Sequence, residues 1–307
     1  MNILIVGLGS IAQKHIKAIK SLNLNATLFA LRSTQDASSY EGVINIYNLE
    51  NIEVLLDFVI ISNPTFLHYK FIKKFAEKNI PLFIEKPVLQ NLDNSLDLVQ
   101  FVESNNLLTY TACNLRFHPC LIYLKDLINS NDDKVEEVNI YCGSYLPDWR
   151  PGKNYKDLYS ANSKMGGGVH LDLFHEFDYT TWIFGMPKNS FSLKRNVSSL
   201  MIDAVDYANY NLEYKEFTAN IVLNYYRKTP RRSIEIVMKN KILLVDLINN
   251  IISDEMNQIL FSAPGYNILN TYFDQMQYFV NCLKLDQKPM NSLKESIEVL
   301  KIVLQNE

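Results

Sequence analysis

The chain has few cysteines and no long apolar run. Its four cysteines form no Cys-x-x-Cys pair and no dense cluster, which excludes a small disulfide-stapled fold and predicts a reducing, cytoplasmic environment. No apolar stretch approaches the roughly 18 residues that a membrane-spanning helix needs. Residues 1–11 are apolar but lack a basic start, so we do not expect a signal peptide.

An excess of positive charge is also absent. The formal net charge is −3, so the sequence predicts no general affinity for nucleic acid or for an anionic membrane. At 307 residues, with 48% hydrophobic and 21% charged side chains, the chain is long enough for two domains with sizeable cores. These bulk properties are those of an ordinary globular protein.

Glycine is scarce, yet five of the ten glycines lie in two short stretches. The first follows an apolar stretch that is typical of a buried parallel strand, and it reads Gly7-Leu8-Gly9-Ser10-Ile11-Ala12 before a helical segment. Gly7 allows a tight turn, Gly9 leaves room for a phosphate, and Ala12 allows close packing of the helix on the strand. Because a helix start offers N–H groups and a positive dipole, this pattern predicts a dinucleotide site.

Strand-like and helix-like segments alternate through the first third of the chain, as in a doubly wound α/β domain. We predict strands at 26–31, 43–47, 58–62, 81–84 and 108–112, with helices from 10, at 67–78 and at 91–104. Beyond residue 119 the segments 135–143, 190–197, 219–225, 234–238 and 241–247 alternate apolar and polar residues, which is typical of antiparallel strands. Helices are expected at 272–283 and 293–304. The sequence thus predicts an α/β protein with a Rossmann domain over 1–119 and an α+β domain with a mostly antiparallel sheet over 120–307.

The end of the second strand decides the expected cofactor. An NAD enzyme places an acidic residue there, whereas this chain has Arg32-Ser33-Thr34. A guanidinium and hydroxyl groups suit the 2′-phosphate of NADP, so NADP is favoured over NAD. Two alternatives stay open: Arg32 is a solvated loop residue, or a shifted loop brings Asp36 to the ribose.

Two further segments follow predicted strands, where ligands sit in an open α/β sheet. Ser62-Asn63-Pro64 with His68 follows the fourth strand, and Glu85-Lys86-Pro87 follows the fifth. An ammonium group at such a strand end could polarise a reacting oxygen and stabilise a developing alkoxide. Position alone favours a surface lysine, and only the segment after the second glycine stretch favours a functional role for Lys86.

The second glycine stretch, Gly166-Gly167-Gly168, precedes Val169-His170-Leu171-Asp172-Leu173-Phe174-His175. On one continuous helix, residues three apart project within about 60° of each other, so Asp172 and His175 are predicted to face one pocket. A carboxylate beside an imidazole can orient the ring and support its protonated form. A metal site that includes His170 is less favoured, because residues 170 and 172 point to opposite sides of a helix.

Together these motifs resemble those of the glucose-fructose oxidoreductase/inositol dehydrogenase (Gfo/Idh/MocA) family over nearly the whole chain. They occur in the family's order: Gly7-Leu8-Gly9-Ser10-Ile11-Ala12, Asn63-Pro64 with His68, Glu85-Lys86-Pro87, Asn114-Leu115-Arg116-Phe117-His118-Pro119, and Gly166-Gly167-Gly168 with Asp172 and His175. The resemblance implies bound NAD(P), no metal, and a homodimer or homotetramer built on the sheets. It implies that Lys86 binds substrate and handles a proton, that His175 is the acid/base, and that Asp172 is its partner.

One spacing departs from the family pattern, which separates the aspartate and the histidine by four positions rather than the three between Asp172 and His175. Asp178 is then a candidate partner of His175 as well.

The residues that we expect to bind the cofactor are Gly7, Gly9, Ser10, Ile11, Ala12, Arg32, Ser33, Thr34, Ser62, Asn63, Pro64, His68, Glu85, Lys86, Asn114 and Arg116.

Aromatic and basic residues flank the second glycine stretch, in Ser144–Tyr155 and Tyr225–Arg232. Because aromatic rings stack on sugars and arginines pair with phosphate or carboxylate, we expect a sugar-type substrate, such as a nucleotide-sugar or a sugar acid. The residues expected to bind it are Lys86, Tyr145, Trp149, Arg150, Tyr155, Asp172, His175 and Arg231. The resemblance favours an NAD(P)-dependent dehydrogenase; an NAD-dependent glycoside hydrolase and a non-catalytic cofactor sensor remain alternatives.

Overall fold

A computed structural model describes residues 1–34, 39–130 and 133–305. The chain forms two compact units, one of residues 1–114 and 268–300 and the other of residues 115–267 and 301–307. The first division lies close to the boundary predicted after residue 119. Residues 268–300, however, belong with the first unit, although the sequence pattern had placed them in the second domain.

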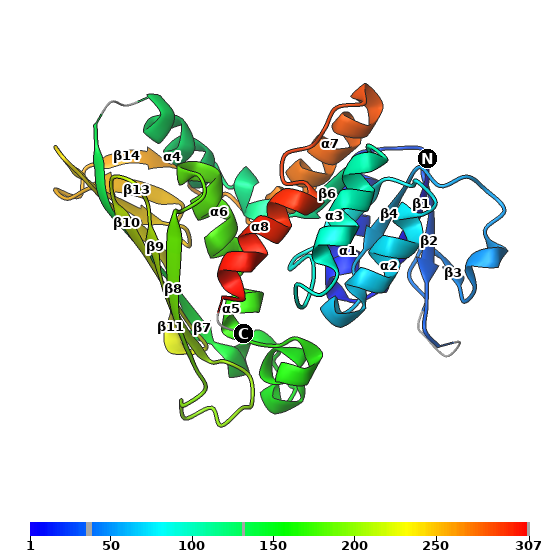
Figure 1. The fold of residues 1–307 in the computed structure, drawn as a ribbon, viewed down its shortest axis with the longest axis horizontal. Helices are drawn as coiled ribbons and strands as arrows, with labels where there is room; N and C mark the ends of the chain where they lie inside the picture. Colours follow the sequence, from blue (N-terminus) through cyan, green and yellow to red (C-terminus); the bar gives the residue numbers. More distant parts are fainter. Residues whose placement is uncertain (35–38, 131–132, 306–307) are drawn as a thin grey trace. The chain divides into compact units, whose positions relative to one another are not determined.

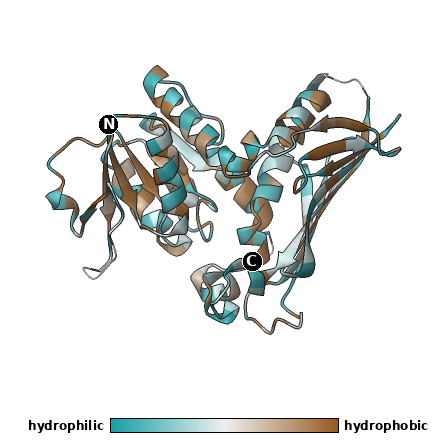
Figure 2. Cartoon of the chain, turned by 180° about the vertical axis from the view of Figure 1, so that it is seen from behind, coloured by the Kyte–Doolittle hydropathy of each residue, from teal (hydrophilic) through white to brown (hydrophobic). Residues whose placement is uncertain are grey.

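The first unit contains a six-stranded parallel sheet with the strand order β3-β2-β1-β4-β5-β6 (Figure 1). Its strands are β1 (Asn2–Val6), β2 (Thr27–Leu31), β3 (Ile44–Ile46), β4 (Phe58–Ile61), β5 (Leu82–Glu85) and β6 (Thr109–Ala112). The central strands β4 and β5 and the edge strand β6 are buried at every residue, and the inner strands of the sheet are mostly hydrophobic (Figure 2). Strands buried on both faces need such continuous apolar runs, so the predicted Rossmann sheet is confirmed.

Helices cover this sheet and complete its core. They are α1 (Ser10–Ser21), α2 (His68–Ala76), α3 (Ser95–Ser104) and α7 (Asn270–Leu285), and the boundary between the units falls within α8 (Leu293–Val303). Phe279 of α7 packs edge-on against Phe58 and Phe83, with ring centroids 5.1 and 5.3 Å apart. These aromatic contacts explain why a C-terminal helix belongs to the N-terminal sheet.

The second unit contains an eight-stranded sheet with the order β14-β13-β12-β11-β7-β10-β9-β8. Its strands are β7 (Val135–Tyr145), β8 (Asn189–Arg195), β9 (Tyr207–Glu213), β10 (Thr218–Asn224), β11 (Tyr226–Met238), β12 (Ile242–Asp246), β13 (Ile251–Asp254) and β14 (Ile259–Ser262). The pair β10 and β7 is parallel, and the other neighbours are antiparallel. A mostly antiparallel second sheet is thus confirmed.

One face of this sheet packs against helices and the other carries polar residues. The helices are α4 (Pro119–Ser130), α5 (Val169–Asp172) and α6 (His175–Phe184), and Phe177 of α6 contacts Tyr210 of β9 with centroids 4.6 Å apart. On the opposite face Asn211, Asn220 and Asn139 lie directly opposite one another on three neighbouring strands. The alternation along each strand separates these two faces.

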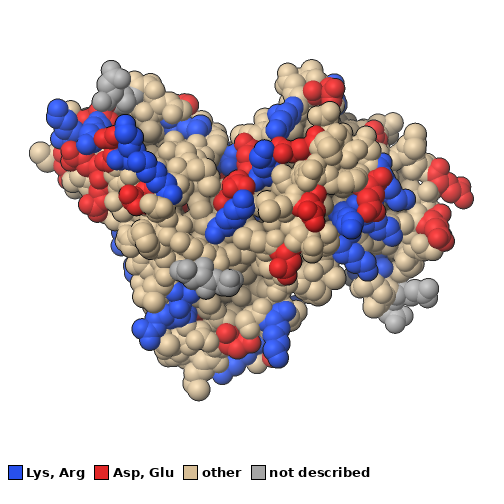
Figure 3. Space-filling model, in the orientation of Figure 1, with Lys and Arg blue, Asp and Glu red and all other residues tan. Residues whose placement is uncertain are grey.

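Short 3-10 helices connect these elements, at Leu49–Asn51, Thr65–Leu67, Asn114–Phe117, Leu146–Trp149, Tyr155–Asp157, Tyr159–Ala161 and Ser163–Met165. Among the described residues, no helix is both long and apolar enough to cross a bilayer. Basic and acidic side chains are interspersed on the face shown in Figure 3.

Candidate functional site

The turn between β1 and α1 has the geometry of a phosphate cradle. Gly7 has φ +85°, and a methyl group added there would lie 2.9 Å from Cα of Asn63, so only glycine fits. A methyl group added at Gly9 would meet no described atom within 4 Å. Gly9 precedes α1, which is capped by no described side chain and has no acidic residue in its first turn. The helix dipole therefore faces open space that suits an anion.

Further along the motif, Ser10 is exposed, Ile11 is half-buried and Ala12 is fully buried. Ala12 thus packs α1 onto the sheet, as predicted for a small residue. Ser62 follows β4, and its hydroxyl donates to the carbonyl of Val6 at 3.1 Å. This hydrogen bond ties the end of β4 to the glycine turn.

The side-chain amide of Asn63 lies just after β4, at the carboxyl end of that strand. Its Oδ1 and Nδ2 atoms are both buried, and neither has a hydrogen-bond partner among the described residues. Pro64, which follows, is exposed. Because buried polar atoms are normally paired, an unpaired donor and acceptor beside the cradle fit a polar ligand, and a nicotinamide dinucleotide offers the matching groups.

The side chain of Arg32 lies at the end of β2, where the adenosine ribose is expected. Its Nη1 donates to Oδ1 of Asn45 on the neighbouring strand at 3.3 Å, and Ser33 and Thr34 are exposed. Asp36, the alternative ribose ligand, lies outside the described residues. The described part of this loop therefore presents one guanidinium and two hydroxyl groups.

Lys86 directly follows β5, is half-buried and forms a cis peptide bond with Pro87. Glu85, the last residue of β5, is buried and accepts a hydrogen bond from the backbone N–H of Lys86 at 3.2 Å. Its other carboxylate oxygen lies 2.5 Å from Nε2 of His15 on α1. Glu85 thus connects the lysine to α1, rather than pointing toward solvent.

His68 has a different environment from the one expected of a cofactor ligand. The ring is 1% exposed, with Nε2 2.9 Å from the carbonyl of Asn63 and Nδ1 3.2 Å from the carbonyl of Val88. Burial lowers the pKa of His68 below its usual value. The ring lies between the loops that bear Asn63 and Val88, and in its neutral form it donates to one of the two carbonyl oxygens.

Asn114 and Arg116 also have partners within the protein. The amide of Asn114 donates to the hydroxyl of Thr271 on α7 at 2.6 Å. Arg116 forms a two-pronged ion pair with Asp178, with Nη2 2.7 Å from Oδ1 and Nε 3.0 Å from Oδ2. Both Arg116 and Asp178 are buried, so this pair fixes the helix that follows His175 rather than offering a guanidinium to solvent.

The predicted single helix through Asp172 and His175 is wrong, because the segment breaks into two helices. Asp172 is the last residue of α5 and His175 is the first residue of α6. Leu173 between them has φ −96° and ψ 38°, outside the helical region. Helical periodicity therefore does not relate the two side chains, and each is oriented by its own helix.

Two tyrosines hold the Asp172 carboxylate. The hydroxyl of Tyr225 donates to Oδ2 at 2.5 Å, and the hydroxyl of Tyr159 donates to Oδ1. Burial, together with the negative charge of Asp172, raises the pKa of both tyrosines well above the usual value. Both phenols therefore stay protonated and act as donors to the carboxylate.

The glycine stretch places these partners close to α5. A methyl group at Gly167 would lie 2.1 Å from the backbone oxygen of Tyr159, and Gly168 has φ +144°. Only glycine allows this approach. The stretch therefore shapes the surroundings of Asp172, in addition to preceding a helix.

The first turn of α6 is fixed by two buried ion pairs. Glu176 accepts hydrogen bonds from Nε and Nη2 of Arg232 on β11, at 2.6 and 3.0 Å, and Asp178 binds Arg116. Burial lowers the pKa of Arg232, but the charge of the Glu176 carboxylate and its hydrogen bonds outweigh this, and the pKa rises above its usual value. The half-buried His175 stands at the start of this immobilised turn.

The predicted substrate residues are only partly gathered around Asp172. Trp149 packs edge-on against Tyr225, with centroids 5.3 Å apart, and its Nε1 donates to the hydroxyl of Ser144. The hydroxyl of Tyr155 donates to the carbonyl of Leu200 at 3.0 Å. Arg150 is exposed, and Nζ of Lys228 lies 3.1 Å from the ring centroid of Tyr145.

Arg231 lies on the other face of the sheet. Its neighbour Arg232 binds Glu176 on the helix-covered face, and successive side chains of a strand point to opposite faces. The guanidinium of Arg231 lies 5.2 Å from the ring centroid of Tyr141. The structure thus separates Arg231 from Asp172 and His175.

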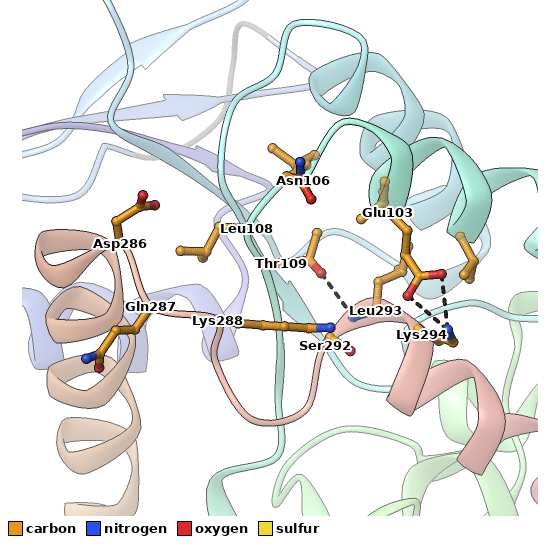
Figure 4. Close-up of a pocket in the computed structure, with 13 residues that line it drawn as sticks. Glu103, Asn106, Leu108, Thr109, Asp286, Gln287, Lys288, Ser292, Leu293 and Lys294 are labelled. Atoms are coloured by element: carbon orange, nitrogen blue, oxygen red, sulfur yellow. Dashed lines mark hydrogen bonds and ion pairs between the residues drawn. The ribbon is translucent and has the colours of Figure 1, made fainter.

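A cavity of about 380 Å³ lies elsewhere in the first unit, at the start of β6 (Figure 4). Its wall includes Thr109, Lys288 and the ion pair between Lys294 and Glu103. Thr109 begins β6, whereas Gly7 follows the end of β1. Because the strands are parallel, the cavity lies at their amino ends and the glycine turn at their carboxyl ends. Among the described residues, no group of three His, Cys, Asp or Glu side chains could hold a metal ion.

Three partners of the predicted site residues, His15, Tyr159 and Tyr225, were not themselves predicted as site residues, although Tyr225 begins a segment expected to contact the substrate. His15 lies three positions after Ala12, which puts it on the inward side of α1. A polar residue on the buried face of a helix is a usable signal for a partner in the core. The two tyrosines carried no such signal, because their contacts with Asp172 span distant parts of the sequence.

The parallel sheet, the glycine turn and the open space at the start of α1 define a dinucleotide-binding domain of the Rossmann type. Residues 1–112 match the family described as "Oxidoreductase family, NAD-binding Rossmann fold". Inositol 2-dehydrogenase from Rhizobium meliloti (strain 1021) is 25% identical over 189 residues, which cover 59% of this chain and 54% of that protein. The chain spans about half the length of the curated relatives it matches.

Solved structures match the fold over nearly the whole chain. Levoglucosan dehydrogenase in complex with NADH and levoglucosan has a TM-score of 0.85 and 12% identity, covering 99% of this chain and 95% of that one. UDP-N-acetylglucosamine 3-dehydrogenase from Acidithiobacillus ferrooxidans has a TM-score of 0.79 and 16% identity, covering 99% and 96%. The match of residues 1–112 to this oxidoreductase family and the likeness of the whole chain to these structures agree on a Rossmann domain followed by a second, sheet-based domain.

Proposed function

We propose that the protein is an NAD(P)-dependent dehydrogenase that acts on a secondary hydroxyl or ketone of a sugar or sugar derivative. The observation that supports this most directly is the open space at Gly9, at the uncapped start of α1 and on the sheet edge where Asn63 has its unpaired amide. Gly9 and the N–H groups of α1 would hold the pyrophosphate, and Asn63 would bind a polar group of the same ligand. When bound, the nicotinamide supplies the hydride acceptor or donor.

Lys86 and His175 would share the handling of the substrate oxygen and its proton. The Lys86 ammonium would donate a hydrogen bond to the reacting oxygen and stabilise the negative charge that develops on it. His175 would accept the hydroxyl proton in oxidation and return it in reduction. Asp172, whose carboxylate is held by Tyr159 and Tyr225, is the proposed partner of His175.

The substrate class rests on related proteins and on aromatic residues near Asp172. The relatives named above act, by their names, on inositol, on an anhydrosugar and on a nucleotide-sugar. Trp149 and Tyr159 offer ring surface in the unit that holds Asp172, which suits a polyol or sugar ring. An anionic derivative would pair with Arg150, which is exposed in the same unit.

A panel of inositols, sugar acids, anhydrosugars and nucleotide-sugars tests the proposal, with either cofactor and with absorbance at the nicotinamide band as the readout. We expect at least one compound to give a stoichiometric change in that absorbance. Release of an aglycone with no net change would instead identify a hydrolase. Tight cofactor binding without turnover of any compound would identify a sensor.

Cofactor preference is a separate part of the proposal, and we propose NADP. Replacing Arg32 with Asp exchanges attraction for repulsion beside the 2′-phosphate. Because a hydrogen bond to a charged group contributes about 1.5–3 kcal/mol, Arg32→Asp is expected to shift the NADP/NAD affinity ratio on the order of 10- to 100-fold toward NAD. Fluorescence titration of both cofactors against both proteins measures the ratio, and an unchanged ratio would remove Arg32 from the site.

We also propose that the protein assembles as a homo-oligomer. Phe191 and Leu193 of β8 are 62% and 54% exposed. They continue the rows of Asn211 and Asn209 on the face of the second sheet opposite its helices. Apolar side chains at the edge of such a face support burial against a second copy.

A further inference from the structure

We propose that His15 is a positioning residue for Lys86 and that it acts through the carboxylate of Glu85. This inference rests on the proposed function, because the group being positioned is the lysine of the proposed reaction. It concerns the first unit alone, which contains all three residues.

A chain of short polar contacts connects the helix to the lysine. His15 is completely buried on α1, and its Nε2 lies 2.5 Å from Oε1 of Glu85. Oε2 of the same carboxylate accepts the hydrogen bond from the backbone N–H of Lys86 at 3.2 Å. One oxygen of the Glu85 carboxylate thus contacts His15 and the other accepts the hydrogen bond from Lys86. Movement of His15 would therefore change the direction of the hydrogen bond to Lys86.

Packing alone does not explain a histidine at this position. The ring stands edge-on to Phe83 with centroids 4.8 Å apart, and Tyr272 lies 5.9 Å away, so an apolar side chain would suit the surroundings. Nδ1 is buried without a partner among the described residues, which is unfavourable for a polar atom. The contact between Nε2 and Glu85 is the interaction that offsets this penalty.

The location of His15 also joins the two functional parts of the first unit. The helix that carries His15 begins at Ser10, directly after the open space at Gly9. On the other side of the lysine, His68 contacts the carbonyl of Val88. The turn from Glu85 to Val88 is thus held at both ends, and the proposed phosphate helix fixes one of them.

The first test observes the hydrogen bond itself and needs no substrate. Protein labelled with 15N-lysine gives an amide resonance for Lys86, assigned by its loss in Lys86→Arg. His15→Phe keeps a ring but removes the donor, whereas His15→Gln places an amide nitrogen near the position of Nε2. We expect the Lys86 resonance to move in His15→Phe and to return toward its original position in His15→Gln.

A control separates this effect from general loss of packing on α1. Ile19 is buried on the same helix, so Ile19→Ala should lower the melting temperature but leave the Lys86 resonance in place. If the resonance stays in place in His15→Phe, or moves equally in Ile19→Ala, the inference is wrong. This result stands whether or not the protein is a dehydrogenase.

The second test measures turnover on a substrate identified by the panel. His15→Phe should lower kcat about 10- to 100-fold, the range for groups that orient a directly acting residue, with cofactor affinity unchanged. His15→Gln should restore most of the loss. In the Lys86→Met background, His15→Phe should cause no further loss, because the two residues act as one unit; multiplicative losses would contradict the inference. Absence of turnover across the panel would refute the proposed function and leave the resonance test decisive for His15.

Discussion

Replacing Lys86 with Met is expected to lower turnover about 10²- to 10⁴-fold while cofactor affinity stays near that of the wild type. The loss is in this range because a positioned side chain that handles a proton or stabilises a developing oxyanion contributes that much to the rate. Met keeps the length and the apolar stem of lysine, so the half-buried side chain can still pack. Steady-state kinetics and a fluorescence titration of the cofactor separate the two quantities.

A second lysine of the same unit provides the control. Lys73 is exposed on α2, and Lys73→Met should leave both turnover and cofactor affinity unchanged. If Lys86→Met turned over substrate at nearly the wild-type rate, the lysine would have no part in the chemistry. A loss of cofactor affinity that matched the loss of turnover would make Lys86 a binding residue instead.

Much of the parallel sheet was predictable because several of its strands can be recognised from short apolar runs in the sequence. Runs such as Phe58–Ile61 are apolar at every position. The predicted segment 58–62 differs from β4 by one residue at one end, and 81–84 differs from β5 by one residue at each end. The membership of α7 in the first unit was not predictable. It depends on contacts of Phe279 with residues more than 190 positions earlier in the chain, which no local pattern encodes.

In the second sheet, the sequence pattern did not predict β9, whose alternation includes residues of low strand propensity. β9 reads Tyr-Ala-Asn-Tyr-Asn-Leu-Glu, with Ala208, Tyr210 and Leu212 buried. Its asparagines have low strand propensity, and this obscured the alternation. The short strands β13 and β14 and the helix α4 were missed as well.

For the candidate site, the sequence located the residues but not their partners. Gly9 and Lys86 lie where the motifs placed them, after β1 and β5. The partners of Asp172 and Glu85 come from other elements of the same units, and such tertiary contacts leave no spacing in the sequence. For Arg231 the sequence neighbours were misleading. Basic and aromatic residues beside it suggested a substrate ligand, but strand alternation puts Arg231 on the face of the second sheet opposite the one where Arg232 binds Glu176.

Replacing Gly9 with Val is expected to abolish measurable cofactor binding and to leave the fold intact. The backbone at Gly9 is extended, with φ −79° and ψ −173°, and its missing side chain faces open space, so Val fits the empty protein. The branched side chain would occupy the space proposed for the pyrophosphate. Each lost hydrogen bond to a charged group contributes about 1.5–3 kcal/mol, so affinity should fall on the order of 100-fold or more. Gly7→Ala should instead lower the stability of the fold. A left-handed conformation destabilises a non-glycine residue by about 1–2 kcal/mol, and the added methyl group would contact Asn63. Thermal unfolding and cofactor titration of both variants measure the contrast, and normal binding by Gly9→Val would place the cofactor elsewhere.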